Sequence, residues 1–329
     1  MFKSILVPLD GSELAEGSLP HARTMAAAFG ACVTLLHVSE APPETSINVF
    51  DWSLRKAEAE AYLLKQAAEL QRAGLSVECR LLEGPAAQRI VEYAEQQQMS
   101  LIVMSSHGRG GLSRWNLSHI AQKVLQQTSS SILLVQAEHA GREAAAARYS
   151  RILAPLDGSR RAECVLPVAT RLIAHDQAEL ILAHVTSQPF IFNRLMPTGE
   201  ERAMAAQLAR LNRARAEAYF EDLATRLVRE SFASDFGSGN GAVVETALPV
   251  SDNVVLTLQN MVADRAVDLV LLSAHGHSAQ SQWSFGSVVT NFVFYGSVPL
   301  LVVQDLPQLL NQQPLEEFAR RQALQGVQN

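Results

Sequence analysis

The sequence predicts an α/β protein made of two tandem copies of one domain, each a five-stranded parallel sheet flanked by helices. Two observations lead to this prediction: an internal repeat, and a regular alternation of strand and helix patterns within each copy. The repeat starts with ILVPLDGS at 5–12 and ILAPLDGS at 152–159, which sets Asp10 and Asp157 147 positions apart. A fixed offset of this kind is the sequence signature of a duplicated structural unit.

The end of the repeat has a different register. Ser-Ser-His-Gly at 105–108 aligns with Ser-Ala-His-Gly at 273–276, an offset of 168, so the second copy carries 21 extra residues in its middle. They fall around 199–241, where residues 200–230 predict one long charged helix and residues 234–241 predict a loop. Two interpretations of this insertion stay open: an extended crossover helix, or an arm that binds a partner.

The elements of the first copy each have their own signal. Residues 4–9 form a short apolar run with little alternation, which is typical of a parallel strand buried on both faces. Ser12 can cap a helix that we expect to continue to about Phe29. Residues 52–72 have helical spacing, and Gly74 ends that helix.

The remaining elements complete an alternating order. Pro85 opens a helix that reaches about residue 98, and another helix is predicted near 118–127. Strands are predicted at 33–38, 77–82, 101–104 and 132–135, and the second copy repeats the order and ends in a strand at 300–303. Strands that alternate with helices form parallel sheets through right-handed crossovers.

These patterns divide the chain into two domains, at 1–138 and 149–305, followed by a tail at 306–329 with a predicted helix at 315–325. Residues 136–148 are polar and Ala-rich, which is typical of a linker. The last strands, 132–135 and 300–303, are apolar, and an edge strand with open hydrogen bonds needs to be covered. We therefore expect the two copies to pair through these strands as an internal pseudo-dimer.

Composition excludes several classes of protein. Of the 329 residues, 48% are hydrophobic and 18% charged, which is typical of globular domains. The net charge of −6 argues against nucleic acid as a partner. No apolar stretch approaches the roughly 18 residues of a membrane span, and the run at 5–9 is too short for a signal peptide core. The three cysteines show no metal-binding spacing, so we expect free thiols in the cytoplasm.

The candidate ligand site lies at the carboxyl ends of the first and fourth strands, where open parallel sheets bind their ligands. The loop after the first strand holds Pro8 and Asp10 in the first copy, and Pro155 and Asp157 in the second. Each carboxylate can accept hydrogen bonds from ribose hydroxyls or an adenine amino group. It can equally cap the helix that follows, and both roles stay open.

The loop after the fourth strand supplies small residues and a helix start. Gly108 and Gly276 allow a ligand to approach the backbone, and after nine further residues Ser118 and Gly286 begin a helix. A helix N-terminus offers unpaired N–H groups and a partial positive charge to a phosphate. Gly286 permits close approach, and Ser287 adds a hydroxyl donor.

Four histidines near these strand ends invite a catalytic interpretation. We expect His107 and His275 to hydrogen-bond the loops to which they belong, and His37 and His184 to satisfy buried backbone groups. No GxxxxGK[ST] motif and no GxSxG motif occurs, which disfavours a P-loop nucleotidase and an α/β-hydrolase.

The combined pattern of VPLDGS, an HG-containing loop, nine residues and Gly-Ser resembles the universal stress protein family. The resemblance covers both copies. It implies a five-stranded parallel sheet flanked by helices, the adenine nucleotide alpha-hydrolase-like architecture. It also implies adenine-nucleotide binding in some members and none in others. The family's loop pattern is Gly-x-x-Gly, nine residues, then Gly followed by Ser or Thr.

Both copies depart from that pattern. Ser105 and Ser273 replace the first glycine, and Ser118 replaces the glycine that opens the helix in the first copy. The second copy is therefore closer to the pattern. The first copy alone has cations in this loop, Arg109 and Arg114.

The resemblance and these residues favour a stress-response module that binds ATP, AMP or another adenine nucleotide, more strongly in the second copy. Two alternatives remain: a scaffold that binds no nucleotide and acts through partner surfaces, and a slow ATPase. Phosphoryl transfer needs a metal ion and a positioned nucleophile, and no acidic cluster supports Mg²⁺ here. We therefore expect at most weak ATP hydrolysis. A homodimer is a further expected assembly.

Overall fold

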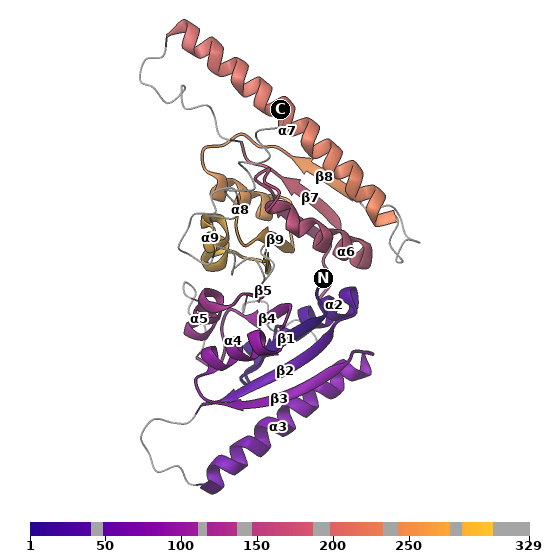
Figure 1. Ribbon diagram of the computed structural model, residues 1–329, viewed down its shortest axis with the longest axis vertical. Coiled ribbons are helices and arrows are strands. Elements are labelled where there is room, and N and C mark those ends of the chain that lie inside the picture. The colour runs from indigo at the N-terminus through magenta and orange to yellow at the C-terminus, as the bar shows by residue number, and fades with distance from the viewer. Residues whose placement is uncertain are drawn as a thin grey trace, which may run out of the picture.

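The described strands form one continuous ten-stranded sheet that runs through both halves of the chain (Figure 1). The computed structural model describes residues 1–40, 49–110, 117–136, 147–186, 198–232, 243–276 and 285–304. The strand order is β3-β2-β1-β4-β5-β10-β9-β6-β7-β8. Within each half every pair of neighbouring strands is parallel, which confirms the predicted fold class.

The elements follow the predicted alternation. The first half contains β1 (Ser4–Pro8), α1 (Glu13–Glu16), α2 (Leu19–Phe29), β2 (Cys32–Ser39), α3 (Val49–Arg72), β3 (Val77–Glu83), α4 (Ala86–Gln96), β4 (Leu101–Ser105), α5 (His119–Gln127) and β5 (Ser131–Val135). The second half contains β6 (Arg151–Pro155), the 3₁₀ helix η2 (Ala162–Val165), α6 (Leu166–Asp176), β7 (Glu179–Ala183), α7 (Gly199–Phe232), β8 (Val243–Ala247), α8 (Val254–Asp264), β9 (Leu269–Ser273), α9 (Ser287–Tyr295) and β10 (Leu300–Val303).

The prediction of one helix from Ser12 to Phe29 is wrong in one respect, because the structure has two helices there, α1 and α2. Ser12 does cap α1, and its hydroxyl accepts a hydrogen bond from the Ala15 N–H. Pro20 stands in the first turn of α2. Its nitrogen carries no hydrogen, so it cannot continue the hydrogen-bond ladder of the preceding helix, and the chain starts a new helix instead.

Helices cover both faces of the sheet, and each face has a core that extends across the two halves. On one face the core includes residues of α2, α3, α6 and α7. On the other face it includes residues of α4, α5, α8 and α9. Leu133 of β5 and Leu301 of β10 belong to the first core, and Ile132 and Leu300 to the second. The hydrophobic cores therefore do not stop at the boundary between the halves.

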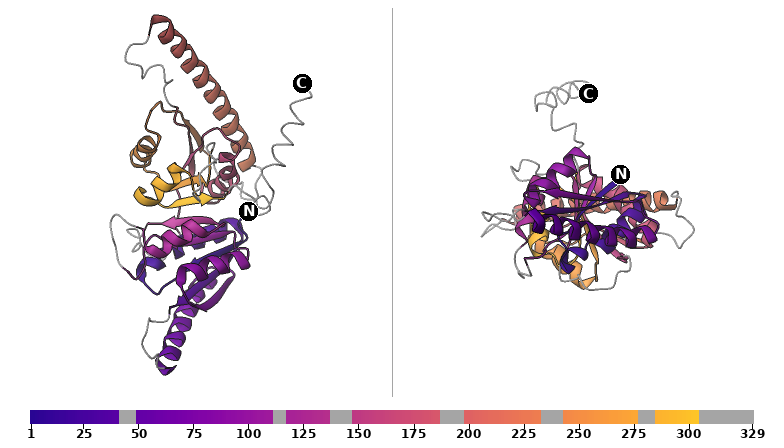
Figure 2. Two further views of the ribbon diagram at one scale, coloured as in Figure 1. Left: turned by 60° about the vertical axis from the view of Figure 1, so that its left-hand side comes forward. Right: turned by 90° about the horizontal axis from the view of Figure 1, so that it is seen from below.

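The two halves meet through their last strands, as predicted. β5 and β10 pair antiparallel, with Leu133 opposite Leu301 at the centre of the seam. Figure 2 shows the halves stacked along the long axis with these strands between them. A second contact lies beside the seam, where Arg171 of α6 donates from Nε to the carbonyl of Ala28, at the end of α2, over 2.6 Å. Thus α6 supplies a cap for the last turn of α2.

The long charged helix predicted at 200–230 is present as α7, which is 34 residues long. Its C-terminal half packs on the sheet through Phe220, Leu223 and Leu227, all of them buried. Across the described ranges, no helix combines the length and apolarity needed to cross a bilayer. The predicted loop at 234–241 and the predicted tail helix at 315–325 lie outside the described residues.

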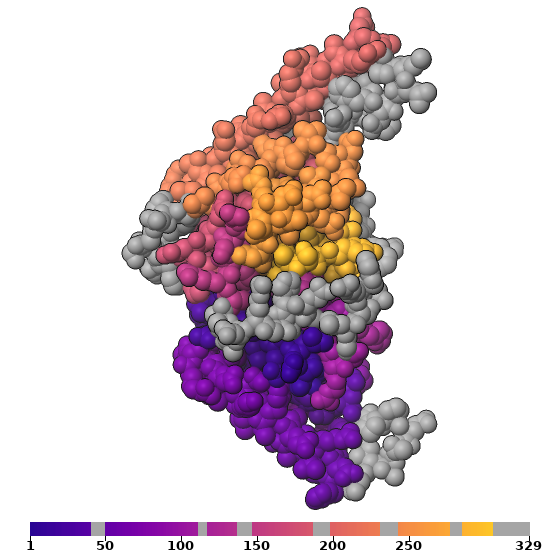
Figure 3. Space-filling model, turned by 180° about the vertical axis from the view of Figure 1, so that it is seen from behind, coloured from indigo at the N-terminus to yellow at the C-terminus, as the bar shows by residue number. Residues whose placement is uncertain are grey.

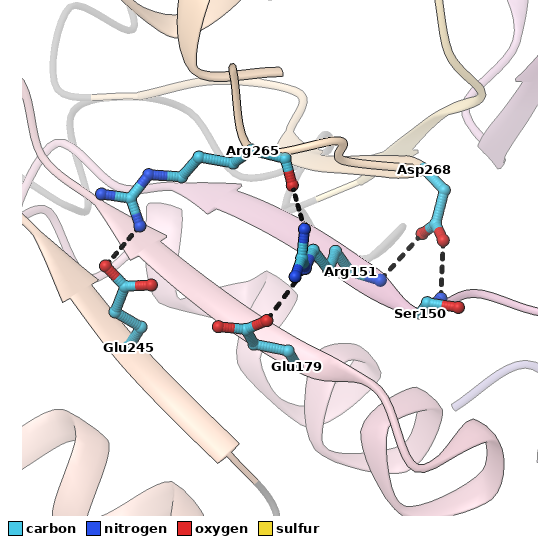
Figure 4. Close-up of polar contacts among 6 residues, drawn as sticks. All are labelled: Ser150, Arg151, Glu179, Glu245, Arg265 and Asp268. Carbon is cyan, nitrogen blue, oxygen red and sulfur yellow. Dashed lines mark hydrogen bonds and ion pairs between the residues drawn. The ribbon is translucent and has the colours of Figure 1, made fainter. Parts of the chain in front are cut away.

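The edge of the sheet away from the candidate site is tied by polar contacts that differ between the halves. In the second half, the carboxylate of Asp268 accepts from the N–H groups of Ser150, at 2.6 Å, and Arg151, at 3.1 Å (Figure 4). In the first half, Ser100 Oγ accepts from the equivalent N–H groups of Lys3 and Ser4, at 3.0 and 3.1 Å. Burial raises the pKa of Asp268 above its ordinary value of 3.8.

Replacing Asp268 should show which property of this position matters. Asp268→Ala leaves two N–H groups without their acceptor and should lower the free energy of unfolding by about 1 kcal/mol. Asp268→Ser restores the arrangement of the first half and should cost less. Because the folded-state pKa of Asp268 is raised, the native protein loses stability as pH rises from the unfolded value towards the folded one. Both variants should abolish that part of the pH dependence in urea titrations, and equal destabilisation by Ser and Ala would contradict this account.

Candidate functional site

The two loops predicted to form the site lie side by side in each half. β1 pairs with both β2 and β4, and β6 pairs with both β7 and β9. The chain therefore leaves the sheet in opposite lateral directions from these adjacent strands, which is the switch point at which ligands bind in open α/β sheets. Pro8 and Pro155 are the last residues of β1 and β6, and each sets an aspartate two residues beyond the strand.

Asp10 joins the two loops of the first half. Its Oδ1 accepts from the Ser12 N–H at 3.0 Å, and its Oδ2 accepts from the Arg109 N–H at 2.7 Å. A Cβ placed on Gly108 would lie only 2.1 Å from Oδ2, so only glycine lets the carboxylate approach this closely. The structure therefore brings the predicted residues Asp10 and Gly108 into contact.

The second half repeats this arrangement with Asp157 and Gly276. Asp157 Oδ1 accepts from the Ser159 N–H at 2.9 Å. A Cβ on Gly276 would lie 2.3 Å from Asp157 Oδ2. In both halves the glycine after the aspartate, Gly11 or Gly158, has a φ of +80°, a conformation that glycine adopts without strain. Each aspartate thus shapes its loop. The predicted alternative, that the aspartate caps the following helix, is wrong, because the cap residue is Ser12 for α1 and Arg161 for η2.

The helices after these loops begin differently in the two halves. Ser118 caps α5, and its hydroxyl accepts from the Ala121 N–H at 3.2 Å. Gly286 occupies the same position before α9, where no side chain caps the first turn. The backbone N–H of each cap residue bonds the fourth-strand loop: Ser118 to the carbonyl of Ser106, and Gly286 to that of Ala274, at 2.9 and 3.0 Å. Among the described residues, the first turn of α9 therefore lacks the side-chain cap that Ser118 gives to α5, and uncapped N–H groups of this kind can bind phosphate.

Residues 106 and 274 were not singled out from the sequence, although they connect the site to the seam. Ser106 donates its N–H to the carbonyl of Val135, at the end of β5, and Ala274 donates to Val303, at the end of β10, each at 2.8 Å. Their side chains differ, and their role is carried by the backbone. The only sequence signal was their position inside the repeated Ser-x-His-Gly segment.

Three of the four histidines, His37, His184 and His107, are placed as expected. His37 Nδ1 lies 2.9 Å from the carbonyl of Leu9, and His184 Nδ1 lies 2.8 Å from that of Leu156, so each ring donates to a backbone group. Burial lowers the pKa of His37 below its ordinary value of 6.5, which keeps the ring neutral at pH 7. His107 Nδ1 lies 3.0 Å from Ser106 Oγ within its own loop. The backbone carbonyl of His275 accepts from Ser273 Oγ at 2.7 Å.

The charge of the two sites also differs. Arg109 lies over the first-strand loop, because a Cβ on Gly11 would be 3.3 Å from its guanidinium nitrogen. Both Arg109 and Asp10 lie close enough to His37 to act on the pKa of its ring, Arg109 lowering it and Asp10 raising it. The second cation noted in this loop, Arg114, lies outside the described residues.

Comparisons with known proteins give one consistent result. The family model described as the universal stress protein family matches residues 1–136 and 148–304. A curated universal stress protein of Methanocaldococcus jannaschii is 30% identical over 141 residues, which cover 41% of this chain and 83% of that protein. Another, from Thermus aquaticus, is 31% identical over 137 residues, covering 41% of this chain and all of that protein.

The solved structures agree at the level of the fold. The crystal structure of a universal stress protein from Archaeoglobus fulgidus aligns with 93% of this chain and 100% of its own, with a TM-score of 0.63 and 17% sequence identity. At that identity the likeness concerns the arrangement of helices and strands in both halves. The site residues have to be judged from the geometry described above.

Proposed function

The chain belongs to the universal stress protein family, and from this premise we propose that it binds an adenine nucleotide, ATP or AMP, at the tips of β6 and β9 in the second half. The base and ribose would lie against the loop of Pro155 and Asp157. The phosphates would lie at the start of α9. The equivalent site of the first half, with Pro8, Asp10, Gly108 and Ser118, would bind more weakly.

The observation that carries this preference is the uncapped first turn of α9. In the first half the hydroxyl of Ser118 already accepts a hydrogen bond from the first turn of α5. Gly286 has no side chain to do so, and a phosphate oxygen can take that place. Ser287, the first residue of α9, offers a hydroxyl beside the same N–H groups. The helix dipole adds a favourable interaction with negative charge.

The aspartate can serve a ligand while it holds its loop. A carboxylate has about four lone-pair directions, so the bond from the Ser159 N–H does not use up Asp157 as an acceptor. Ribose hydroxyls are donors of suitable geometry. Gly276 keeps the backbone beside Asp157 bare, which suits the close approach of a flat or charged ligand.

The first test is direct identification of the ligand. Protein purified under native conditions should release an adenine nucleotide that mass spectrometry detects, and calorimetry with added ATP and AMP should give at least one binding site. Purified protein that releases no nucleotide and gives no heat with either compound would favour the scaffold alternative. Steady-state assays with ATP and Mg²⁺ should show turnover well below the usual enzymatic range of about 1 s⁻¹ or more.

Changing Gly286 tests which half binds. Gly286→Val should crowd the start of α9 and weaken nucleotide binding more than tenfold, or about 1.4 kcal/mol. Gly286→Ala is the matched control, because its Cβ would be 3.8 Å from the nearest atom, the carbonyl oxygen of Ala274, which is ordinary contact. It should bind nearly as well as the wild type. Unchanged affinity in Gly286→Val, measured by calorimetry, would exclude α9 as the phosphate site.

Changing the arginines tests the competing site. If cations matter more than an uncapped helix, Arg109→Ala or Arg114→Ala should abolish the binding that Gly286→Val leaves intact. If α9 binds the phosphate, both arginine variants should retain wild-type affinity. The two sets of variants therefore assign the nucleotide to one half.

A further inference from the structure

The N-terminal half of α7 presents an apolar stripe that neither the fold nor the proposed site uses. Met204, Leu208 and Leu211 are 69%, 46% and 51% exposed. Their spacing of four and three residues places them on one side of the helix. Figure 3 shows this end of α7 projecting from the molecule. A contiguous stripe of this kind on a soluble protein marks an interaction surface.

The stripe is distinct from the side of α7 that packs on the sheet. The residues that pack there, Phe220, Leu223 and Leu227, lie in the C-terminal half. They lie on the same face of the helix as the buried Ala205, and this face is rotated by about 100° about the helix axis from Met204. Farther along the stripe's own line lies Arg226, which pairs with Glu163 of η2 at 3.1 Å. This face of α7 is therefore polar in the C-terminal half, where Arg226 contacts η2, and apolar in the N-terminal half.

The charges that flank the stripe are arranged symmetrically. Glu200 precedes Met204 by four residues, and Arg215 follows Leu211 by four, and both are exposed. Consider two copies of this helix that pair antiparallel, with Met204 of one opposite Leu211 of the other. In that register Glu200 of one copy lies opposite Arg215 of the other. The two-fold axis then passes between Gln207 and Leu208. A two-fold interface requires this self-complementarity.

The equivalent helix of the first half lacks this pattern. The buried residues Leu63 and Leu70 of α3 correspond to Phe220 and Leu227 of α7, an offset of 157. In that register Leu208 corresponds to Asp51, and Arg215 corresponds to Glu58. α3 does expose Leu54, the counterpart of Leu211, but a carboxylate interrupts its stripe. The self-complementary surface is therefore specific to α7.

We propose that α7 is a dimerisation arm, whose stripe of Met204, Leu208 and Leu211 pairs antiparallel with the same stripe of a second copy of this chain. Pairing covers the exposed apolar side chains and sets each Glu200 opposite an Arg215. It explains why α7 extends so far beyond the residues that hold it on the sheet. The interface joins the second halves and leaves the internal seam between β5 and β10 intact.

Analytical ultracentrifugation of the full chain tests this proposal. The wild type should show a concentration-dependent equilibrium between monomer and dimer. Leu208→Glu should be monomeric throughout the same range, because it places two like charges at the two-fold axis. Leu208 is already exposed, so the thermal midpoint of this variant should match that of the wild type. Leu54→Glu makes the same change on α3 and should dimerise normally.

A charge exchange tests the antiparallel register. Glu200→Arg alone and Arg215→Glu alone should each raise the dissociation constant about tenfold, since each sets like charges opposite one another. The double variant carries both reversals in every chain and should restore wild-type dimerisation. A wild type that stays monomeric, a dimer that survives Leu208→Glu, or a double variant weaker than both single variants would overturn the proposal. The proposal would also be overturned if the chain stayed monomeric and co-sedimented with vesicles that contain phosphatidylserine, because the stripe would then bind a membrane surface.

Discussion

Leu301→Asp is expected to destabilise both halves of the chain together. Leu301 is fully buried at the centre of the seam, opposite Leu133. A carboxylate there would be buried without a partner, which should lower the free energy of unfolding by about 4 kcal/mol. Because the core on this face contains residues from both halves, neither half can lose the seam without exposing its own apolar edge.

Calorimetry and urea titration by circular dichroism measure this effect. The wild type should unfold in one transition with equal calorimetric and van't Hoff enthalpies, and Leu301→Asp should shift that single transition downward. Val243→Asp is the matched control, because Val243 is 58% exposed in β8 at the far edge of the sheet. It should change stability by less than about 0.5 kcal/mol. Two separate transitions in the wild type would show that the halves unfold independently.

The sequence predicted the seam because its signal is strong and local. Two four-residue apolar runs at the ends of two copies leave few alternatives to pairing, and Ile132 opposite Val302 confirms that pairing. The same holds for His37 and His184, whose repeated position at the end of the second strand predicted a backbone partner. In each case the repeat offers two observations of one structural role.

Other features depend on contacts between distant segments, which one sequence does not reveal. Whether Asp10 serves its loop could not be decided, because its second partner, Arg109, is 99 residues away. The exchange of Ser100 for Asp268 was invisible for the same reason, since their partners lie at the start of the first strand of each half, far away in the sequence. The break between α1 and α2 was missed although Pro20 signalled it. The helical spacing continues on both sides of this proline, so the sequence carries two opposing signals there.

Among substitutions at the candidate site, the one that disrupts the contact between Asp157 and Gly276 should lower nucleotide affinity and stability the most. In Gly276→Ala the new Cβ would lie 2.3 Å from Asp157 Oδ2, whereas ordinary contacts exceed about 3.4 Å. The carboxylate has to rotate away and give up its hydrogen bond from Ser159. We expect nucleotide affinity to fall more than tenfold and stability to fall by about 2 kcal/mol, the scale of a lost bond to a charged group.

A double variant separates this clash from other effects of alanine. If Gly276→Ala acts by displacing the carboxylate, it should be nearly neutral for stability when added to Asp157→Ala, because the atom that it meets is gone. Gly110→Ala is the control, since its Cβ would meet nothing within 4 Å. Additive losses from Gly276→Ala and Asp157→Ala in urea titrations would contradict the contact. Loss of stability with unchanged nucleotide affinity would show instead that Asp157 only shapes its loop, and would place the ligand elsewhere on this edge of the sheet.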